Sequence, residues 1–312
     1  MESLKLSFMS VAPIFILMLL GYFLRCMKLV DKKTLDAVNK LIFKAFLPTL
    51  LFYNIYTTKT ENFMDTPLIT FTIVAVLCVF VVGLLVVGLL TKDASKRGVM
   101  LQGFFRSNFA ILGIPLIHYM CGIESSSLAS LMAAVIIPVF NILAVISLEL
   151  FRGGRVRIFK VLFGVITNPL IIGCALGYVF YRFGIKLPGV VETAVKDISK
   201  IASPLSLIVL GGSFTFSSIR GYVKDIFTVV FTRLVFVPAI VLFVAAVLGF
   251  RGEAFACLIV AFGSPVAVSS FAMAQQMDGD EKLAGQVVVI SSALCLFSLF
   301  GIIFVSSYFG II

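Results

Sequence analysis

One short stretch, Asn108–Pro115, most constrains the fold of this chain, because it places an amide and a Gly-x-Pro break inside the apolar segment 98–120. A proline inside a helix removes a backbone hydrogen bond and costs about 3 kcal/mol or more. In hydrocarbon the freed groups have no water to bind, so such a break is tolerated only where protein or a cavity satisfies them. We therefore expect Gly113 to end one half-helix and Pro115 to begin another, with a polar gap between them.

The rest of the chain is apolar enough to lie in a bilayer. Of its 312 residues 61% are hydrophobic and 13% are charged, and the mean hydropathy is +1.15. A helix needs about 20 apolar residues to cross a membrane. The sequence therefore predicts an all-α polytopic membrane protein with ten transmembrane helices, at 7–25, 45–56, 66–90, 98–120, 127–151, 158–181, 201–216, 226–249, 253–275 and 284–309.

The net charge of +10 indicates membrane topology rather than nucleic-acid binding, because the basic residues lie in short loops between apolar spans. With the N-terminus outside, sixteen lysines and arginines fall on the inner side and seven on the outer side. This asymmetry follows the positive-inside rule. We expect a multi-pass protein of the plasma membrane with both termini outside. It should be embedded in the lipid bilayer and bind no nucleic acid.

An internal repeat appears at an offset of 156 residues. The segment from Pro13 to Tyr22 matches the segment from Pro169 to Tyr178, and the match continues into the following span. The offset covers five spans, an odd number, so the two halves have opposite orientations in the membrane. The sequence thus predicts a five-plus-five inverted repeat, with the first half at 1–156 and the second at 157–312.

The fourth span of each half is predicted to be a broken crossover helix. Gly263, Ser264 and Pro265 in span nine repeat the Gly-x-Pro of Gly113 and Pro115 in span four. The distance from the start of the span to the break differs by four residues, so we expect the two broken helices to be unequal. Two half-helix N-termini that meet near the midplane would form an anion site.

Three polar residues lie within predicted spans, Asn108 and Arg106 in span four and Arg233 in span eight. Asn108 can donate two hydrogen bonds to a carboxylate, or it can join neighbouring helices. Arg106 can snorkel or pair structurally, or it can attract an anion. For Arg233 we favour a structural role.

Some motifs are missing from the sequence. It has no catalytic signature, no paired aspartates within a span and no metal-binding spacing, so we expect no enzyme, no cofactor and no metal. The acidic residues all lie in loops or near the ends of spans, which disfavours coupling by a deep carboxylate. Sodium held by backbone carbonyls at a helix break remains open.

The segment Asn108–Pro115, together with Ser264-Pro265 and Ala274-Gln275-Gln276, resembles the auxin efflux carrier family. The resemblance covers the whole chain. It implies a scaffold part at about 1–60 and 157–217 and a transport part at about 61–156 and 218–312, which moves against the scaffold as an elevator. It also implies that Asn108 contacts the substrate carboxylate and that a homodimer forms through the scaffold.

The chain is similar to the compact bacterial members of that family, because it has no long hydrophilic loop between its halves. Plant members have a serine where this chain has Leu51, which argues against auxin as the physiological substrate. The resemblance implies a small carboxylate such as malate or malonate.

These observations lead to one hypothesis and two alternatives. The hypothesis is a secondary transporter that moves a small organic carboxylate anion, auxin-like or a dicarboxylate, by alternating access. One alternative is a sodium-coupled symporter similar to the bile-acid transporters, and the other is a membrane sensor that binds a ligand without flux. The residues predicted to form the substrate site are Asn108, Ile114, Pro115, Ser264, Pro265, Val266 and Leu51.

Overall fold

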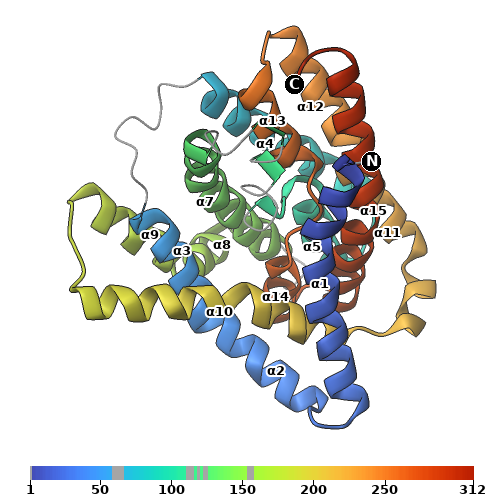
Figure 1. The fold of residues 1–312 in the computed structure, drawn as a ribbon. Helices are drawn as coiled ribbons and strands as arrows, with labels where there is room; N and C mark the ends of the chain where they lie inside the picture. Colours follow the sequence, from blue (N-terminus) through green and yellow to red (C-terminus); the bar gives the residue numbers. More distant parts are fainter. Residues whose placement is uncertain (1, 58–66, 110–115, 118–119, 122–125, 153–157) are drawn as a thin grey trace.

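The computed structural model describes the chain except residues 1, 58–66, 110–115, 118–119, 122–125 and 153–157, and its described part is helical apart from one isolated β-bridge (Figure 1). Four stretches in this part are long and apolar enough to cross a membrane: Pro67–Leu90, Leu131–Phe151, Val223–Val247 and Glu281–Tyr308. Shorter apolar helices accompany them. The predicted all-α polytopic class is therefore confirmed, whereas the count of ten spans stays a prediction.

The first half begins with a long apolar helix and an amphipathic one. The side chain of Asp31 begins the second helix by accepting a hydrogen bond from the Thr34 N–H at 2.7 Å. A π-helical turn, η1, follows and leads into the next helix. The elements are α1 (Glu2–Cys26), α2 (Lys32–Leu41), η1 (Ile42–Phe46), α3 (Leu47–Tyr56), α4 (Pro67–Leu90), α5 (Ala94–Phe105) and α7 (Ser126–Phe151).

The second half contains one break that the hydropathy did not predict. The apolar run 158–181 consists of two helices, because Asn168 caps the second helix and Pro169 occupies its first turn. One continuous span at 158–181 is therefore wrong. The elements are α8 (Ile158–Ile166), α9 (Pro169–Arg182), α10 (Gly189–Ser213), η3 (Phe216–Gly221), α11 (Val223–Phe231), η4 (Thr232–Phe236), α12 (Val237–Val247), α13 (Gly252–Gly263), α14 (Ser269–Gln276) and α15 (Glu281–Tyr308).

Helix α1 packs against α10, and α3 packs against α9. Glycines 156 residues apart mark the two contacts. A Cβ on Gly21 of α1 would lie 1.9 Å from the carbonyl oxygen of Ile208 in α10, and a Cβ on Gly177 of α9 would lie 2.7 Å from that of Phe52 in α3. Small residues let helix backbones approach closely in membranes. The matched glycines of the sequence repeat thus make corresponding contacts.

The structure describes the two predicted helix breaks to different extents. Helix α13 ends at Gly263, as predicted, and the chain is unwound up to α14 (Figure 1). Helix α5 ends at Phe105, and the chain is unwound at 106–108; Gly113, Ile114 and Pro115 lie outside the described residues, so the predicted break there stays a prediction. Both α5 and α13 have 12 residues. The two helices that lead into the breaks are therefore equal in length, which contradicts the expected inequality for α5 and α13.

Arg233 explains why α5 ends where it does. The side chain is fully buried and extends from the π-helical turn η4 to the ends of both half-helices. Its three nitrogens donate to the carbonyl oxygens of Phe105 at 3.1 Å, Ala261 at 2.9 Å and Ser264 at 2.9 Å. The last carbonyls of a helix lack partners and carry a partial negative charge. One cation therefore caps two helix C-termini. These contacts support the structural role that we favoured for Arg233.

The unwound segments after α5 and α13 pair with each other through their backbones. Ser107 and Val266 form an antiparallel β-bridge, and the Asn108 N–H donates to the carbonyl oxygen of Pro265 at 2.9 Å. The Val266 N–H donates to Ser291 Oγ of α15 at 3.2 Å. These bonds satisfy peptide groups that would otherwise be unpaired in an apolar interior.

A polar contact joins α2 to α14 and α15. The Gln275 side-chain amide donates to Asp36 Oδ1 at 2.8 Å and to Glu281 Oε2 at 2.7 Å, and it accepts a hydrogen bond from Asn39. We call these four residues the α2–α14 contact.

A further charged contact ties α5 to α11. Lys96 Nζ donates to Asp225 Oδ2 at 2.7 Å, and this hydrogen bond raises the pKa of Lys96 above its ordinary value. The bond connects two helices that both lead toward the crossover.

Candidate functional site

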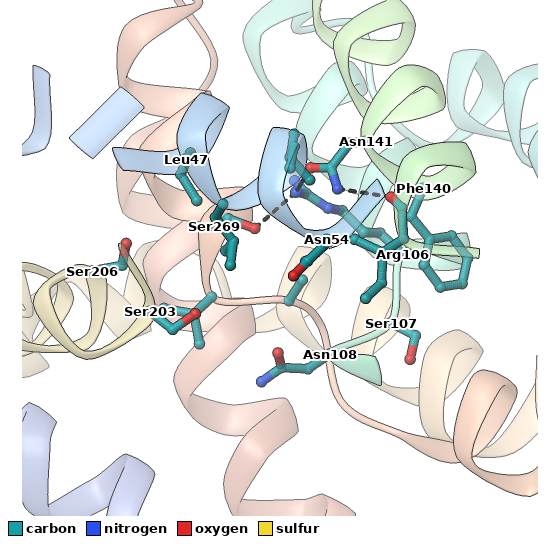
Figure 2. A pocket seen from close by; sticks show the side chains of 15 residues that line it. Leu47, Asn54, Arg106, Ser107, Asn108, Phe140, Asn141, Ser203, Ser206 and Ser269 are labelled. Carbon is teal, nitrogen blue, oxygen red and sulfur yellow. Dashed lines mark hydrogen bonds between the residues drawn. The ribbon is translucent and has the colours of Figure 1, made fainter. Parts of the chain in front are cut away.

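A cavity lies between two groups of elements at the level of the crossover. Helices α3 and α10 line one side, and the other side is lined by α7, by the residues that follow α5 and by the segment before α14 (Figure 2). Its volume is about 50 Å³. Its lining residues are Leu47, Leu50, Leu51, Asn54, Arg106, Ser107, Asn108, Ile137, Phe140, Asn141, Ser203, Ser206, Ala267, Val268 and Ser269.

Arg106 is the charged residue of this lining and is only 2% exposed. Its guanidinium donates to Asn141 Oδ1 and Ser269 Oγ, each at 2.7 Å, as Figure 2 shows. Longer contacts reach Gln102 Oε1 and Ser270 Oγ at 3.3 Å, and a further one reaches Met273 Sδ at 2.8 Å. The snorkelling explanation is wrong, because the side chain is buried and directed toward neutral partners inside the protein.

The positive charge of Arg106 has no neighbouring negative charge in the described part of the chain. The ion pairs there join other residues. An arginine remains protonated in proteins, and a buried charge is normally paired. Neutral oxygens satisfy its N–H groups but do not cancel its charge.

Asn108 contributes an unpaired donor to the same cavity. Its backbone is held by the bond to Pro265, and its side chain is 4% exposed. The Nδ2 atom is buried and has no hydrogen-bond partner among the described residues. A buried donor without a partner costs about 1–3 kcal/mol, so the amide favours occupancy of the cavity by an acceptor.

The other predicted site residues divide into three groups. Leu51 lines the cavity. Ser264, Pro265 and Val266 do not line it; they hold the crossover through their backbone groups. Ile114 and Pro115 lie outside the described residues, so their roles stay predictions.

Asn141, which with Ser269 is the closest side-chain oxygen partner of Arg106, was not predicted from the sequence. An asparagine within the apolar span 127–151, three residues after Pro138, is a signal that was available, since amides are rare in hydrocarbon. Ser203, Ser206 and Phe140 also line the cavity without having been predicted.

The lining suits an anion with an apolar body. Its polar atoms include a guanidinium, an amide donor and hydroxyls, and its apolar walls come from leucines and a phenylalanine. In the described part of the chain, no three His, Cys, Asp or Glu side chains are grouped so that they could hold a metal ion.

A sequence profile of membrane transport proteins matches residues 6–303 of this chain. The chain belongs to the membrane transport protein family. A relative from Methanothermobacter thermautotrophicus, described as an uncharacterized transporter, is 25% identical over 297 residues, which cover 93% of this chain and 95% of the relative. The predicted membership in the auxin efflux carrier family is confirmed, and so is the prediction that the protein is not an enzyme. The protein is a multi-pass membrane transporter.

Proposed function

We propose that this transporter is a secondary carrier for a small organic carboxylate anion. The proposal rests on a cavity lined by the Arg106 guanidinium and the Asn108 amide. Among the described residues, the guanidinium has no neighbouring negative charge and the amide nitrogen has no hydrogen-bond partner. A carboxylate supplies both the acceptor oxygens and the negative charge that these groups lack.

The surroundings of the cavity favour an organic anion over an inorganic one. Leu47, Leu50 and Phe140 form apolar walls next to the polar groups. Binding sites for organic molecules combine apolar walls with a few placed polar groups. A carboxylate with a short apolar or weakly polar body fits this combination.

The position of the cavity supports alternating access. On one side are α3 and α10, which pack with α9 and α1, and on the other are the crossover segments. These two groups are the scaffold part and the transport part of the proposed carrier. Movement of the second against the first, as in an elevator, would expose the cavity to each side of the membrane in turn.

Counterflow in proteoliposomes tests this function, because it requires no knowledge of the driving force. The labelled carboxylates are indole-3-acetate, malate and malonate, each measured in sodium and in sodium-free buffer. We expect sodium-independent accumulation of at least one of them. Sodium dependence would favour a symporter, and saturable binding without counterflow across the panel would favour a sensor; either result contradicts the proposal.

The α2–α14 contact allows a test of the relative movement. Asn39 and Gln275 touch each other across the two proposed parts. In a background without native cysteines, Asn39→Cys and Gln275→Cys joined by a short bis-maleimide should reduce counterflow to the level of empty liposomes, because the link prevents the displacement. Each single-cysteine variant treated with the same reagent is the control. Full counterflow in completely cross-linked protein would contradict an elevator movement.

A further inference from the structure

The two buried arginines of the crossover differ in how their charges are balanced. Arg233 donates to carbonyl oxygens at the C-terminal ends of α5 and α13. Each helix C-terminus carries the equivalent of about half a negative charge, so the two together compensate one cation. Arg106 donates to neutral side-chain oxygens and a sulfur, and not to the main-chain carbonyl groups of a helix C-terminus.

The location of Arg106 makes this imbalance matter for transport. It lies on the side of the cavity that belongs to the transport part, facing the side formed by α3 (Figure 2). Helix α3 presents a mostly apolar surface there, with Leu47, Leu50 and Leu51, and Asn54 is its polar residue in the lining. A charge moved past apolar surface loses solvation, whereas a charge beside its counter-ion forms a nearly neutral pair. The cost of movement therefore depends on whether an anion is bound.

We propose that Arg106 is the resident counter-charge of the transported anion and that it makes this protein an anion exchanger. The inference rests on the proposed function. With a monovalent anion bound, the transport part moves without net charge at the site. When it is empty, the same movement carries one positive charge through the membrane field, so the return of the empty carrier is slow and depends on voltage. A new anion on the other side removes this cost, and exchange becomes faster than net transport.

The experiment compares exchange with net efflux in one preparation of proteoliposomes. Vesicles loaded with labelled malonate, malate or indole-3-acetate are diluted into buffer with or without the same unlabelled anion. We expect exchange to be at least tenfold faster than net efflux. An inside-negative potential, set with potassium and valinomycin, should accelerate net efflux, because the empty carrier then returns with its positive charge moving inward. For indole-3-acetate, which is monovalent at neutral pH, the rate of exchange should not change with the potential.

Two variants connect the effect to the Arg106 charge. Arg106→Lys keeps the charge, so exchange should remain at least severalfold faster than net efflux. Arg106→Gln removes the charge, so the ratio of the two rates should approach one, while the concentration of anion for half-maximal exchange rises about tenfold or more. The voltage test uses the unmodified protein and remains decisive if Arg106→Gln does not fold.

The outcomes separate this inference from the proposed function. Exchange and net efflux at equal rates, or net efflux that does not respond to voltage, would overturn the role of Arg106 while leaving a carrier of organic anions. An Arg106→Gln variant that keeps the tenfold ratio would overturn it as well. No flux with any of the three anions would overturn the proposed function, and the inference with it.

Discussion

Replacement of Asn108 by alanine is expected to lower the rate of carboxylate counterflow about 10- to 100-fold. The variant removes an amide whose donor has no partner among the described residues, and a hydrogen bond to a charged group contributes about 1.5–3 kcal/mol. Folding should persist, because the bond from residue 108 to Pro265 uses the backbone N–H, which alanine retains. Counterflow measures the first effect and the thermal melting temperature the second.

Asn108→Asp is the matched variant, since it keeps the shape of the side chain and replaces the donor with a negative charge. It should lose more counterflow than Asn108→Ala, because the new carboxylate repels the anion. If Asn108→Ala transports at the unmodified rate with an unchanged melting temperature, Asn108 does not contact the substrate.

Replacement of Arg233 by methionine is expected to remove most of the stability of the folded protein. Methionine fills a similar volume but leaves the carbonyl oxygens of Phe105, Ala261 and Ser264 without donors in a fully buried place. Each unsatisfied group costs about 1–3 kcal/mol, and a folded domain has a net stability of only about 5–15 kcal/mol. A large drop in melting temperature, or failure to obtain a monodisperse protein in detergent, is the expected measurement.

Two controls distinguish this role from a general need for positive charge. Arg233→Lys retains the charge but has one nitrogen in place of three, so it should give an intermediate melting temperature. Arg220→Met removes an exposed arginine from η3 and should melt like the unmodified protein. An Arg233→Met protein with unchanged melting temperature would show that the ends of α5 and α13 do not depend on this cap.

Much of the helical architecture was predictable from local sequence. The apolar runs located helices, and the 156-residue offset paired Gly21 with Gly177 before their contacts with α10 and α3 were known. The break at Gly263 was also predictable, since glycine and proline interrupt a helix by their own backbone properties. These features depend on residues close together in the sequence.

The end of α5 and the partners of Arg106 were not predictable in this way. Helix α5 ends at Phe105, a residue with no helix-breaking property, because Arg233 reaches it from 128 positions further along the chain. The interaction of Arg106 with Asn141 and Ser269 likewise joins three separate segments. The motif from Gly113 to Pro115 led us to expect the first half-helix to continue to Gly113. A window of neighbouring residues contains no information about distant contacts that end a helix earlier.

The backbone pairing between Ser107 and Val266 has a consequence for how transporters of this kind diversify. The bridge is made by peptide groups, which every residue except proline supplies in full. The shape of the crossover is therefore largely independent of the side chains that it carries. Residues beside the cavity can be substituted one at a time to suit a different substrate, while the backbone of the crossover stays the same.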